Sequence, residues 1–324
     1  MQQGMGITGK ELSRLNQRIR ATNYLTVAQL FLTNNFLLQT PLAPADVKSR
    51  LLGHWGTCPG INSIYANLHH FFTSRAQAFQ FILGPGHGFP ALQANLFFDG
   101  DLEQIDPKAT RDAQGIAYLC KNFSFPGGFP SHSSPLTPTV ITEGGELGYS
   151  LGAAYGAILG HPEKTVAVLL GDGEFETGSA LASMNLGALL GGTGNGRVLP
   201  ILHLNGYKIS GPTVFARRSE HEQNQLIRGF GFTPIVVPSD DSEQFQFALA
   251  FAQTIQNPFL IFKSDKGATG PEEVDGQKVA DNYLAHQIPL PLAKTDPTQL
   301  KILEDWLKSY HFEELFDPQK GFTI

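Results

Sequence analysis

The stretch LGDGEFETGS at residues 170–179 decides the fold of this chain, because it has the pattern of a strand end, a tight turn and a helix start. Residues 165–170 (TVAVLL) form an unbroken run of apolar and β-branched residues, which is typical of a strand covered on both faces. Residues 178–190 are rich in Ala and Leu and predict a helix. We therefore expect a central parallel strand that leads through a turn into a helix.

A second buried strand is expected at residues 198–204 (VLPILHL), ending at Asn205. Strand, helix and strand in this order form a βαβ unit. In such units, ligands bind beyond the carboxyl ends of the strands, where loop backbone and helix N-termini face an open crevice. The pattern therefore places Asp172 and Asn205 together at a ligand-binding edge.

The side chains at this edge are of the kind that binds a metal ion together with phosphate. An Asp carboxylate and an Asn carbonyl supply hard oxygen ligands, which suit Mg²⁺ or Ca²⁺ completed by phosphate oxygens. Gly171 and Gly173, on either side of Asp172, allow the backbone to approach a phosphate closely. A Gly-Asp-Gly triplet also occurs in ordinary turns, so the prediction depends on the whole order of strand, helix, strand and Asn.

The other predicted elements complete an α/β fold with a mostly parallel central sheet and helices on both faces. Strands are expected at residues 233–237 and 259–263, with a helix over 242–256 between them. Helices are also expected over residues 28–38, from Gly145 onward, and after Asp296, which would cap a helix with Pro297 at its first position. The Gly- and Pro-rich sequence that follows the loop at residues 53–60 and continues to residue 140 predicts mainly loops.

The composition is that of one enzyme-like domain. With 324 residues, 41% hydrophobic and 16% charged, the chain can bury a sizeable core. A formal net charge of -6 without a basic cluster argues against nucleic acid as a partner, but is compatible with local basic pockets and small anionic ligands. Two cysteines without a pairing pattern, and no apolar run long enough for a signal segment or a membrane span, lead us to expect a soluble cytoplasmic protein.

Longer motifs identify a family. Gly171-Asp172-Gly173 followed by Asn205-Gly206-Tyr207 resembles the diphosphate-binding signature of thiamine diphosphate enzymes. The segments that resemble phosphoketolase in particular are LLGHWGT (51–57), GPGHG (84–88), FSFPGG (123–128), EGGELGYS (143–150), ILHLNGYKI (201–209), GP (270–271), VDG (274–276) and AHQ (285–287). The resemblance covers nearly the whole chain.

The resemblance implies a single diphosphate-binding domain over residues 1–324. Within it we expect an N-terminal helical extension at 1–50, and a C-terminal helix with the start of a linker at 296–324. The family's pyrimidine-binding domain and its third domain are expected to be absent from this sequence. The chain would then be inactive without a pyrimidine-binding partner domain or subunit, in a homo- or hetero-oligomer.

The resemblance also implies a reaction. A phosphoketolase uses thiamine diphosphate to cleave a ketose phosphate with inorganic phosphate, giving acetyl phosphate and an aldehyde phosphate. The proton transfers of such a reaction near neutral pH favour histidine. His54, His87, His132 and His286 lie beside glycine or proline turns or loop motifs, where each alone could be a hydrogen-bonded loop residue. The resemblance assigns all four to the active site.

Other site residues follow from the motifs. The expected cofactor-binding residues are Gly145, Glu146, Leu147, Gly171, Gly173, Glu174, Asn205 and Lys266, and the expected metal ligands are Asp172, Asn205 and the backbone carbonyl of Tyr207. Two of these have an alternative interpretation. Glu174 could interact only with a helix dipole, and Lys266 could be a solvated loop lysine rather than a phosphate-binding one.

Three departures from the family pattern keep other functions open. Thr142 stands where the resemblance predicts histidine, Ala268 stands where it predicts tryptophan, and residues 67–70 (NLHH) depart from the expected text HLNR. These changes favour diphosphate binding over substrate handling. The alternatives are a non-catalytic phosphoketolase-like binding or regulatory protein, and a subunit of a split transketolase-like enzyme.

Overall fold

The computed structural model describes residues 7–190, 194–238 and 241–324 of the chain. The chain divides into two compact units, each built from three segments. We call Met1–Leu12, Ala66–Gly86 and Ser133–Asp265 the sheet unit, and Ser13–Tyr65, His87–His132 and Lys266–Ile324 the helical unit. The two units are described separately.

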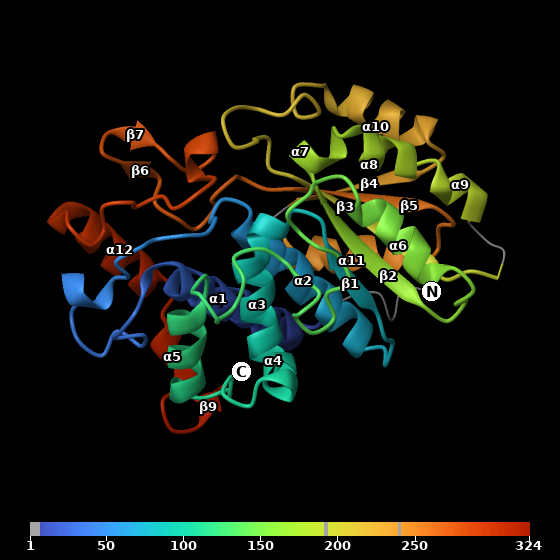
Figure 1. Ribbon diagram of the computed structural model, residues 1–324. Helices are drawn as coiled ribbons and strands as arrows, with labels where there is room; N and C mark the ends of the chain where they lie inside the picture. The colour runs from blue at the N-terminus through green and yellow to red at the C-terminus, as the bar shows by residue number, and fades with distance from the viewer. Residues whose placement is uncertain (1–6, 191–193, 239–240) are drawn as a thin grey trace. The chain divides into compact units, whose positions relative to one another are not determined.

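The sheet unit contains a five-stranded sheet in the order β1-β2-β3-β5-β4 (Figure 1). Its strands are β1 (Gln80–Leu83), β2 (Thr165–Gly171), β3 (Arg197–Leu204), β4 (Thr233–Pro238) and β5 (Pro258–Lys263). All neighbouring pairs are parallel, and Gly171 of β2 lies opposite His203 of β3. The predicted strands are therefore confirmed, and β2 has a paired strand on each side.

Helices cover both faces of this sheet. On one face, α6 (Ser150–Ile158) and α10 (Glu220–Gly229) contribute to a core cluster that includes Phe259 and Ile261 of β5. Phe262, the residue after Ile261, points to the opposite face, where its ring lies 5.3 Å from that of Phe245 in α11 (Ser242–Ala252). The predicted α/β class with helices on both faces is confirmed.

The prediction of one continuous helix over residues 178–190 is wrong. It is divided into α8 (Gly178–Ser183) and α9 (Leu186–Leu190), after the single turn α7 (Asp172–Phe175). The side chain of Thr177 caps α8 by accepting a hydrogen bond from the backbone N–H of Ala180. α6 begins at Ser150 rather than Gly145, and α11 ends at Ala252, four residues before its predicted end at residue 256.

The helical unit contains most of the elements that the sequence did not predict. Its regular elements are α1 (Gly9–Phe31, from Ser13), the first part of α2 (Cys58–Thr73), α3 (Phe89–Asp99), α4 (Asp101–Ile105), α5 (Ala113–Asn122), α12 (Pro297–Ser309), the short hairpins β6–β7 (Glu273–Val274, Gln277–Lys278) and β8–β9 (Phe316–Asp317, Gly321–Phe322), and the 3₁₀ turns η1 (Pro44–Asp46), η2 (Gly86–Gly88, shared with the sheet unit), η3 (Tyr283–Ala285) and η4 (Phe312–Glu314).

The helix predicted at residues 28–38 is wrong, because α1 begins much earlier and ends at Phe31. The loop-rich stretch predicted up to residue 140 is wrong as far as Asn122, where α2 to α5 lie, but residues 123–140 contain no helix or strand, as predicted. The start of α12 is confirmed, since the Asp296 carboxylate accepts from the backbone N–H of Thr298 at 2.7 Å.

Buried polar side chains join the helices of this unit. The Asn62 amide in α2 donates to the Asn23 side chain in α1 at 2.7 Å, and the Asn95 amide in α3 donates to Asn62 at 2.8 Å. Arg18 of α1 forms an ion pair with Asp99 of α3 at 2.8 Å. Such a network costs little when every member is paired, and it specifies how the helices pack.

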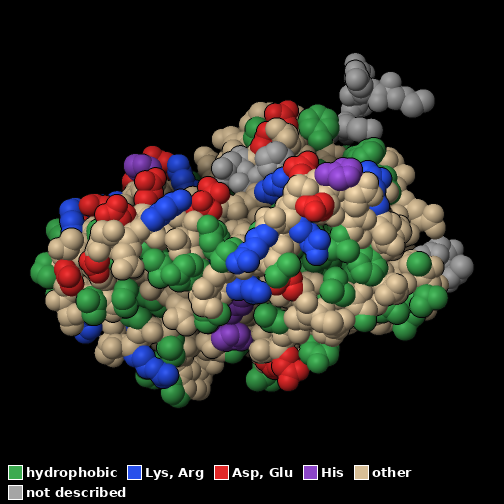
Figure 2. Space-filling model, turned by 90° about the horizontal axis from the view of Figure 1, so that it is seen from above, with side chains coloured by type: hydrophobic (Ala, Val, Ile, Leu, Met, Phe, Trp, Pro, Cys, Tyr) green, Lys and Arg blue, Asp and Glu red, His purple; other side chains and the backbone are tan. Residues whose placement is uncertain are grey.

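No helix within the described residues is long and apolar enough to cross a membrane. Acidic, basic and hydrophobic side chains all reach the face of the molecule that Figure 2 shows.

Candidate functional site

Asp172 links the carboxyl ends of two adjacent strands in the sheet unit. It follows directly after β2 and is only 3% exposed. Its Oδ1 accepts a hydrogen bond from the backbone N–H of Gly173 at 2.9 Å, and its Oδ2 accepts from the backbone N–H of Gly206, just beyond β3, at 2.7 Å. The carboxylate is therefore fixed in orientation by the two loops that it joins.

Asn205 lies at the end of β3 and is 7% exposed. Its side-chain oxygen accepts from the backbone N–H of Tyr207 at 3.2 Å. The following loop closes on itself, since the N–H of Thr213 donates to the carbonyl of Gly206 at 2.9 Å. Gly206 has a φ of 88°, which a side chain would strain. The predicted placement of Asp172 and Asn205 at neighbouring strand ends is thus confirmed.

The oxygens at this edge fit a hard divalent cation. They comprise one buried carboxylate, one side-chain amide oxygen and the main chain of Tyr207, which is the kind of donor set that Mg²⁺ or Ca²⁺ takes when phosphate oxygens complete its coordination. No group of three His, Cys, Asp or Glu side chains within the described residues could hold a metal alone. The edge therefore suits a metal that arrives with an anionic ligand.

Glu174 forms a buried link between two loops. Its Oε1 accepts from the Ser150 hydroxyl at 2.5 Å and from the N–H of Gly148 at 3.2 Å, while its Oε2 accepts from the N–H of Gly171 at 3.2 Å. Burial raises the pKa of this carboxyl, against the lowering effect of these hydrogen bonds. Its side chain thus holds the loop before α6 against the turn after β2.

The loop containing Gly145, Glu146 and Leu147 is fixed at both ends and exposed between them. At one end, a Cβ on Gly144 would lie 2.7 Å from the Cα of Gly86. At the other, Gly148 has a φ of 101°, and a Cβ there would lie 2.2 Å from the Thr177 hydroxyl oxygen. A Cβ on Gly145 would meet no atom within 4 Å. Backbone packing therefore presents these three predicted residues to solvent.

In the helical unit, four histidines from separate loops form a cluster. The ring of His54 lies 5.0 Å from that of His87, 5.5 Å from that of His132 and 5.2 Å from that of His286. The rings of His87 and His286 are 4.8 Å apart. The structure therefore brings together all four of the histidines singled out in the sequence, and we call them the histidine cluster.

Backbone hydrogen bonds between loops hold this cluster in place. The N–H of Trp55 donates to the carbonyl of Gln287 at 3.2 Å, which fixes His54 beside His286. The N–H of Gly267 donates to the carbonyl of Gly56 at 2.8 Å. A Cβ on Gly56 would lie 2.8 Å from the carbonyl oxygen of Ala285, so the close approach of these loops requires glycine.

The environment keeps three of the clustered imidazoles, those of His54, His87 and His286, neutral. Burial, His132 and Lys266 lower the pKa of His54 to about 4, and burial, Lys266 and His54 lower that of His286 to about 3. Burial, followed by the neighbouring histidines, lowers the pKa of His87 well below its usual value. Lys266 is 2% exposed, so the alternative of a solvated loop lysine is wrong.

Two ring nitrogens of the cluster are available to a ligand. The Nδ1 atoms of His54 and His286 are buried and have no hydrogen-bond partner among the described residues. An unsatisfied buried polar atom in a folded protein calls for an explanation, and an absent ligand or water supplies one. Neutral imidazoles near a buried ammonium group can accept protons and attract an anion.

Sequence reasoning missed several supporting residues. Ser150 holds Glu174, as described above, and the buried Thr213 side chain lies 3.5 Å from the Asp172 carboxylate. His203 is fully buried, and its Nε2 lies 2.6 Å from the Ser264 hydroxyl, which ties the end of β3 to the end of β5. The polar His203 inside an apolar strand was the one local signal for this contact.

Comparisons with known proteins give consistent matches. A family model described as "XFP N-terminal domain" matches residues 6–257 and 250–323. A "Probable phosphoketolase" of Bradyrhizobium diazoefficiens is 44% identical over 338 residues, covering 98% of this chain and 42% of that protein. A "Probable phosphoketolase" of Streptomyces coelicolor is 46% identical over 331 residues, covering 96% of this chain and 42% of that protein.

Solved structures support the fold. Transketolase from Campylobacter jejuni superposes with a TM-score of 0.65 at 19% identity, covering 96% of this chain and 44% of that chain. Transketolase from Leishmania mexicana superposes with a TM-score of 0.62 at 19% identity, covering 92% of this chain and 45% of that chain. The chain thus spans about two fifths of the length of the curated relatives that it matches.

Proposed function

Because this chain belongs to the XFP N-terminal domain family, whose curated relatives carry the name phosphoketolase, we propose that it is the thiamine diphosphate- and metal-binding part of a phosphoketolase. Phosphoketolases and transketolases depend on thiamine diphosphate. The observation that carries the proposal is the fixed placement of Asp172 and Asn205 at the carboxyl ends of adjacent parallel strands.

The sheet unit would hold the cofactor through its diphosphate. The Asp172 carboxylate, the Asn205 side-chain oxygen and the Tyr207 carbonyl would bind Mg²⁺ or Ca²⁺, and diphosphate oxygens would complete the coordination. Gly171 and Gly173 leave room for close approach of the diphosphate. The exposed loop residues Gly145, Glu146 and Leu147 would contact the bound cofactor, and Glu174 would position that loop.

The histidine cluster would handle protons and phosphate. Neutral imidazoles can accept a proton once a bound anion raises their lowered pKa, and the unpaired Nδ1 atoms of His54 and His286 provide positions for hydrogen bonds to a substrate. His87 and His132 would act with them. The charge of Lys266 would attract a phosphate group, whose own charge would in turn favour protonation of the imidazoles.

The proposed reaction is the cleavage of a ketose phosphate, such as xylulose 5-phosphate or fructose 6-phosphate, with inorganic phosphate to acetyl phosphate and an aldehyde phosphate. Bound thiamine diphosphate supplies the nucleophilic carbon that such a cleavage requires. The relatives extend well beyond the region matched here. We propose that a pyrimidine-binding part, within a longer chain or as a partner subunit, completes the cofactor site.

Two substitutions favour a second candidate, a non-catalytic binding relative. Thr142 and Ala268 replace the histidine and tryptophan that the family resemblance predicts, and both are partly exposed. The retained histidine cluster favours catalysis instead, because a purely structural protein has no need for four adjacent imidazoles, two of which, His54 and His286, have a buried Nδ1 without a partner among the described residues.

A chimera distinguishes these functions. This chain would replace the corresponding N-terminal region of the Streptomyces coelicolor relative, and acetyl phosphate would be measured with xylulose 5-phosphate, inorganic phosphate, thiamine diphosphate and Mg²⁺. We expect acetyl phosphate from the chimera, and its loss in a His54→Asn chimera. The parent relative serves as the positive control.

If the chimera folds, binds thiamine diphosphate and makes no acetyl phosphate while the parent is active, the catalytic proposal is wrong. Activity that appears only after Thr142→His and Ala268→Trp would identify this chain as a degenerate, non-catalytic relative.

A further inference from the structure

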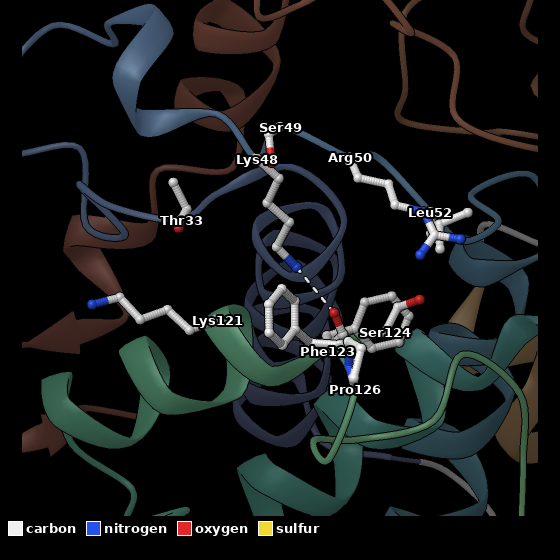
Figure 3. A pocket seen from close by; sticks show the side chains of 10 residues that line it. Thr33, Lys48, Ser49, Arg50, Leu52, Lys121, Phe123, Ser124 and Pro126 are labelled. Atoms are coloured by element: carbon white, nitrogen blue, oxygen red, sulfur yellow. Dashed lines mark hydrogen bonds between the residues drawn. The ribbon is translucent and has the colours of Figure 1, made fainter.

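A basic cavity lies in the helical unit, and it shares no residue with the histidine cluster (Figure 3). Its volume is about 130 Å³, and its lining includes three cationic side chains, those of Lys48, Arg50 and Lys121. No Asp or Glu lines it, and none of the three cations forms an ion pair with a described carboxylate. In a chain with a net charge of -6, this is a marked local reversal of sign.

The cations approach the cavity from different segments. Lys48 precedes α2 along the chain and directs its ammonium group to the loop after α5, where it donates to the carbonyl of Phe123 at 3.3 Å (Figure 3). It also donates to the carbonyl of Gln29 at 2.6 Å. Arg50 extends toward the same loop at Ser124, while Lys121 leaves α5 on the side of Thr33 (Figure 3). Lys48 and Arg50 thus reach the cavity from the segment before α2, and Lys121 reaches it from α5.

Lys48 keeps its charge at a cost. Burial lowers its pKa to about 8, and its hydrogen bonds to Gln29 and Phe123 are both to neutral carbonyls, which leaves one of the three ammonium protons for another acceptor. A half-buried ammonium with a proton still available is stabilised by an anion more than by water.

The loop that forms the cavity wall is also strained. Ser124 has a φ of 56°, which is uncommon for a residue other than glycine, and its N–H donates to the carbonyl of Phe129 at 3.0 Å. Such conformations are found at ligand-binding loops more often than elsewhere. The Ser124 and Thr33 side chains add hydroxyl groups to the lining, and Phe125, which is 65% exposed, adds an aromatic ring.

We propose that this cavity is a binding site for a phosphate group, held by Lys48 and Arg50 and separate from the histidine cluster. At about 30 Å³ of liquid volume for each water, the cavity has room for about four waters, which is enough for a tetrahedral anion. Arg and Lys are the side chains that bind phosphate most effectively, and hydroxyls satisfy its remaining oxygens. The phosphate is either free inorganic phosphate or the terminal group of a small phosphate ester.

Affinity labelling tests the site directly. Pyridoxal phosphate carries a phosphate and an aldehyde; the aldehyde condenses with a lysine amine, releasing water, and borohydride then reduces the imine to a stable adduct that peptide mass spectrometry locates. We expect Lys48 to be labelled by pyridoxal phosphate at least about tenfold faster than by pyridoxal, which lacks the phosphate. The exposed Lys301 should show no such preference.

Protection and a matched pair of variants complete the test. Inorganic phosphate should protect Lys48 and leave Lys301 unprotected, whereas protection by glycerol 3-phosphate alone would identify a phosphate ester as the ligand. Arg50→Gln should raise the half-protecting phosphate concentration about tenfold. Arg14→Gln, at an exposed residue of the same unit outside the cavity, should leave it unchanged. Equal labelling by both aldehydes, or equal protection in the two variants, would overturn the proposal.

Discussion

The histidine cluster should make the protein less stable as the pH falls, and His54 allows the effect to be calculated. Its pKa is about 4 in the folded protein against about 6.5 in an unfolded chain. Because the folded-state pKa is lowered, the contribution to stability is complete above the unfolded pKa and is lost as the pH falls through about 6.5 toward 4. The unfolded chain takes up the proton first.

The size of the effect follows from these two pKa values. Between about pH 7.5 and about pH 5, the linkage relation gives a loss of about 2 kcal/mol for His54 alone. Solvent screening of a partly exposed ring reduces this to about 1 kcal/mol. Repulsion between charged rings opposes a second protonation: two charged rings 5.0 Å apart, as between His54 and His87, would cost about 3 kcal/mol at an effective dielectric constant of about 20.

Urea unfolding of the wild type and of His54→Asn at both pH values measures this contribution. On acidification, the variant should lose about 1 kcal/mol less free energy of unfolding than the wild type. This difference should be larger if His87 and His286 also become easier to protonate once His54 is absent. His161→Asn is the matched control, because that side chain is 56% exposed and lies outside the cluster. If His54→Asn and His161→Asn both lose the same free energy of unfolding as the wild type on acidification, the claim that burial in the cluster lowers the pKa of His54 is wrong.

Three further predictions concern the sheet unit. Gly148→Ala should lower the free energy of unfolding by about 2–3 kcal/mol, because the positive φ of this residue is strained for alanine and the new Cβ would clash with Thr177. Gly145→Ala should change it by less than about 0.5 kcal/mol, and equal urea midpoints for the two variants would contradict this. Glu174→Ala should cost about 2–4 kcal/mol, because it leaves buried donors without an acceptor, and a midpoint close to that of the wild type would contradict it. Removal of divalent metal with EDTA should abolish thiamine diphosphate binding and leave the urea midpoint of the ligand-free protein unchanged, because the N–H groups of Gly173 and Gly206 already hold the Asp172 carboxylate.

The site at the strand ends was predictable because its signals are local. The apolar run of β2, the Gly-Asp-Gly turn and the strand that ends at Asn205 specify their own structure. Parallel pairing then brings Asp172 and Asn205 together without information from elsewhere in the chain. The clustering of the histidines was suggested by the family resemblance, while the lowered pKa values of His54, His87 and His286 required the packing of separate loops.

The helical unit was poorly predicted because its signals are not local. Residues 10–25 are mostly polar but helical, and Asn23 and Arg18 among them are buried because they find partners in α2 and α3. Pro90 near the start of α3 was interpreted as a loop residue, although proline is favoured in the first turn of a helix. The late start of α6 has a similar cause, because Glu174 binds Ser150 and Gly148 and so fixes the preceding loop.

Calorimetric titration with thiamine diphosphate in the presence of Mg²⁺, performed on this chain and on the chimera, tests the central claim most directly. We predict saturable binding at one site, lost in Asp172→Asn, while Glu163→Asn at an exposed residue of the same unit binds as the wild type does. Circular dichroism would show that Asp172→Asn remains folded. Binding that Asp172→Asn leaves unchanged, or no binding by either folded protein, would contradict the assignment of the strand ends as a metal–diphosphate site.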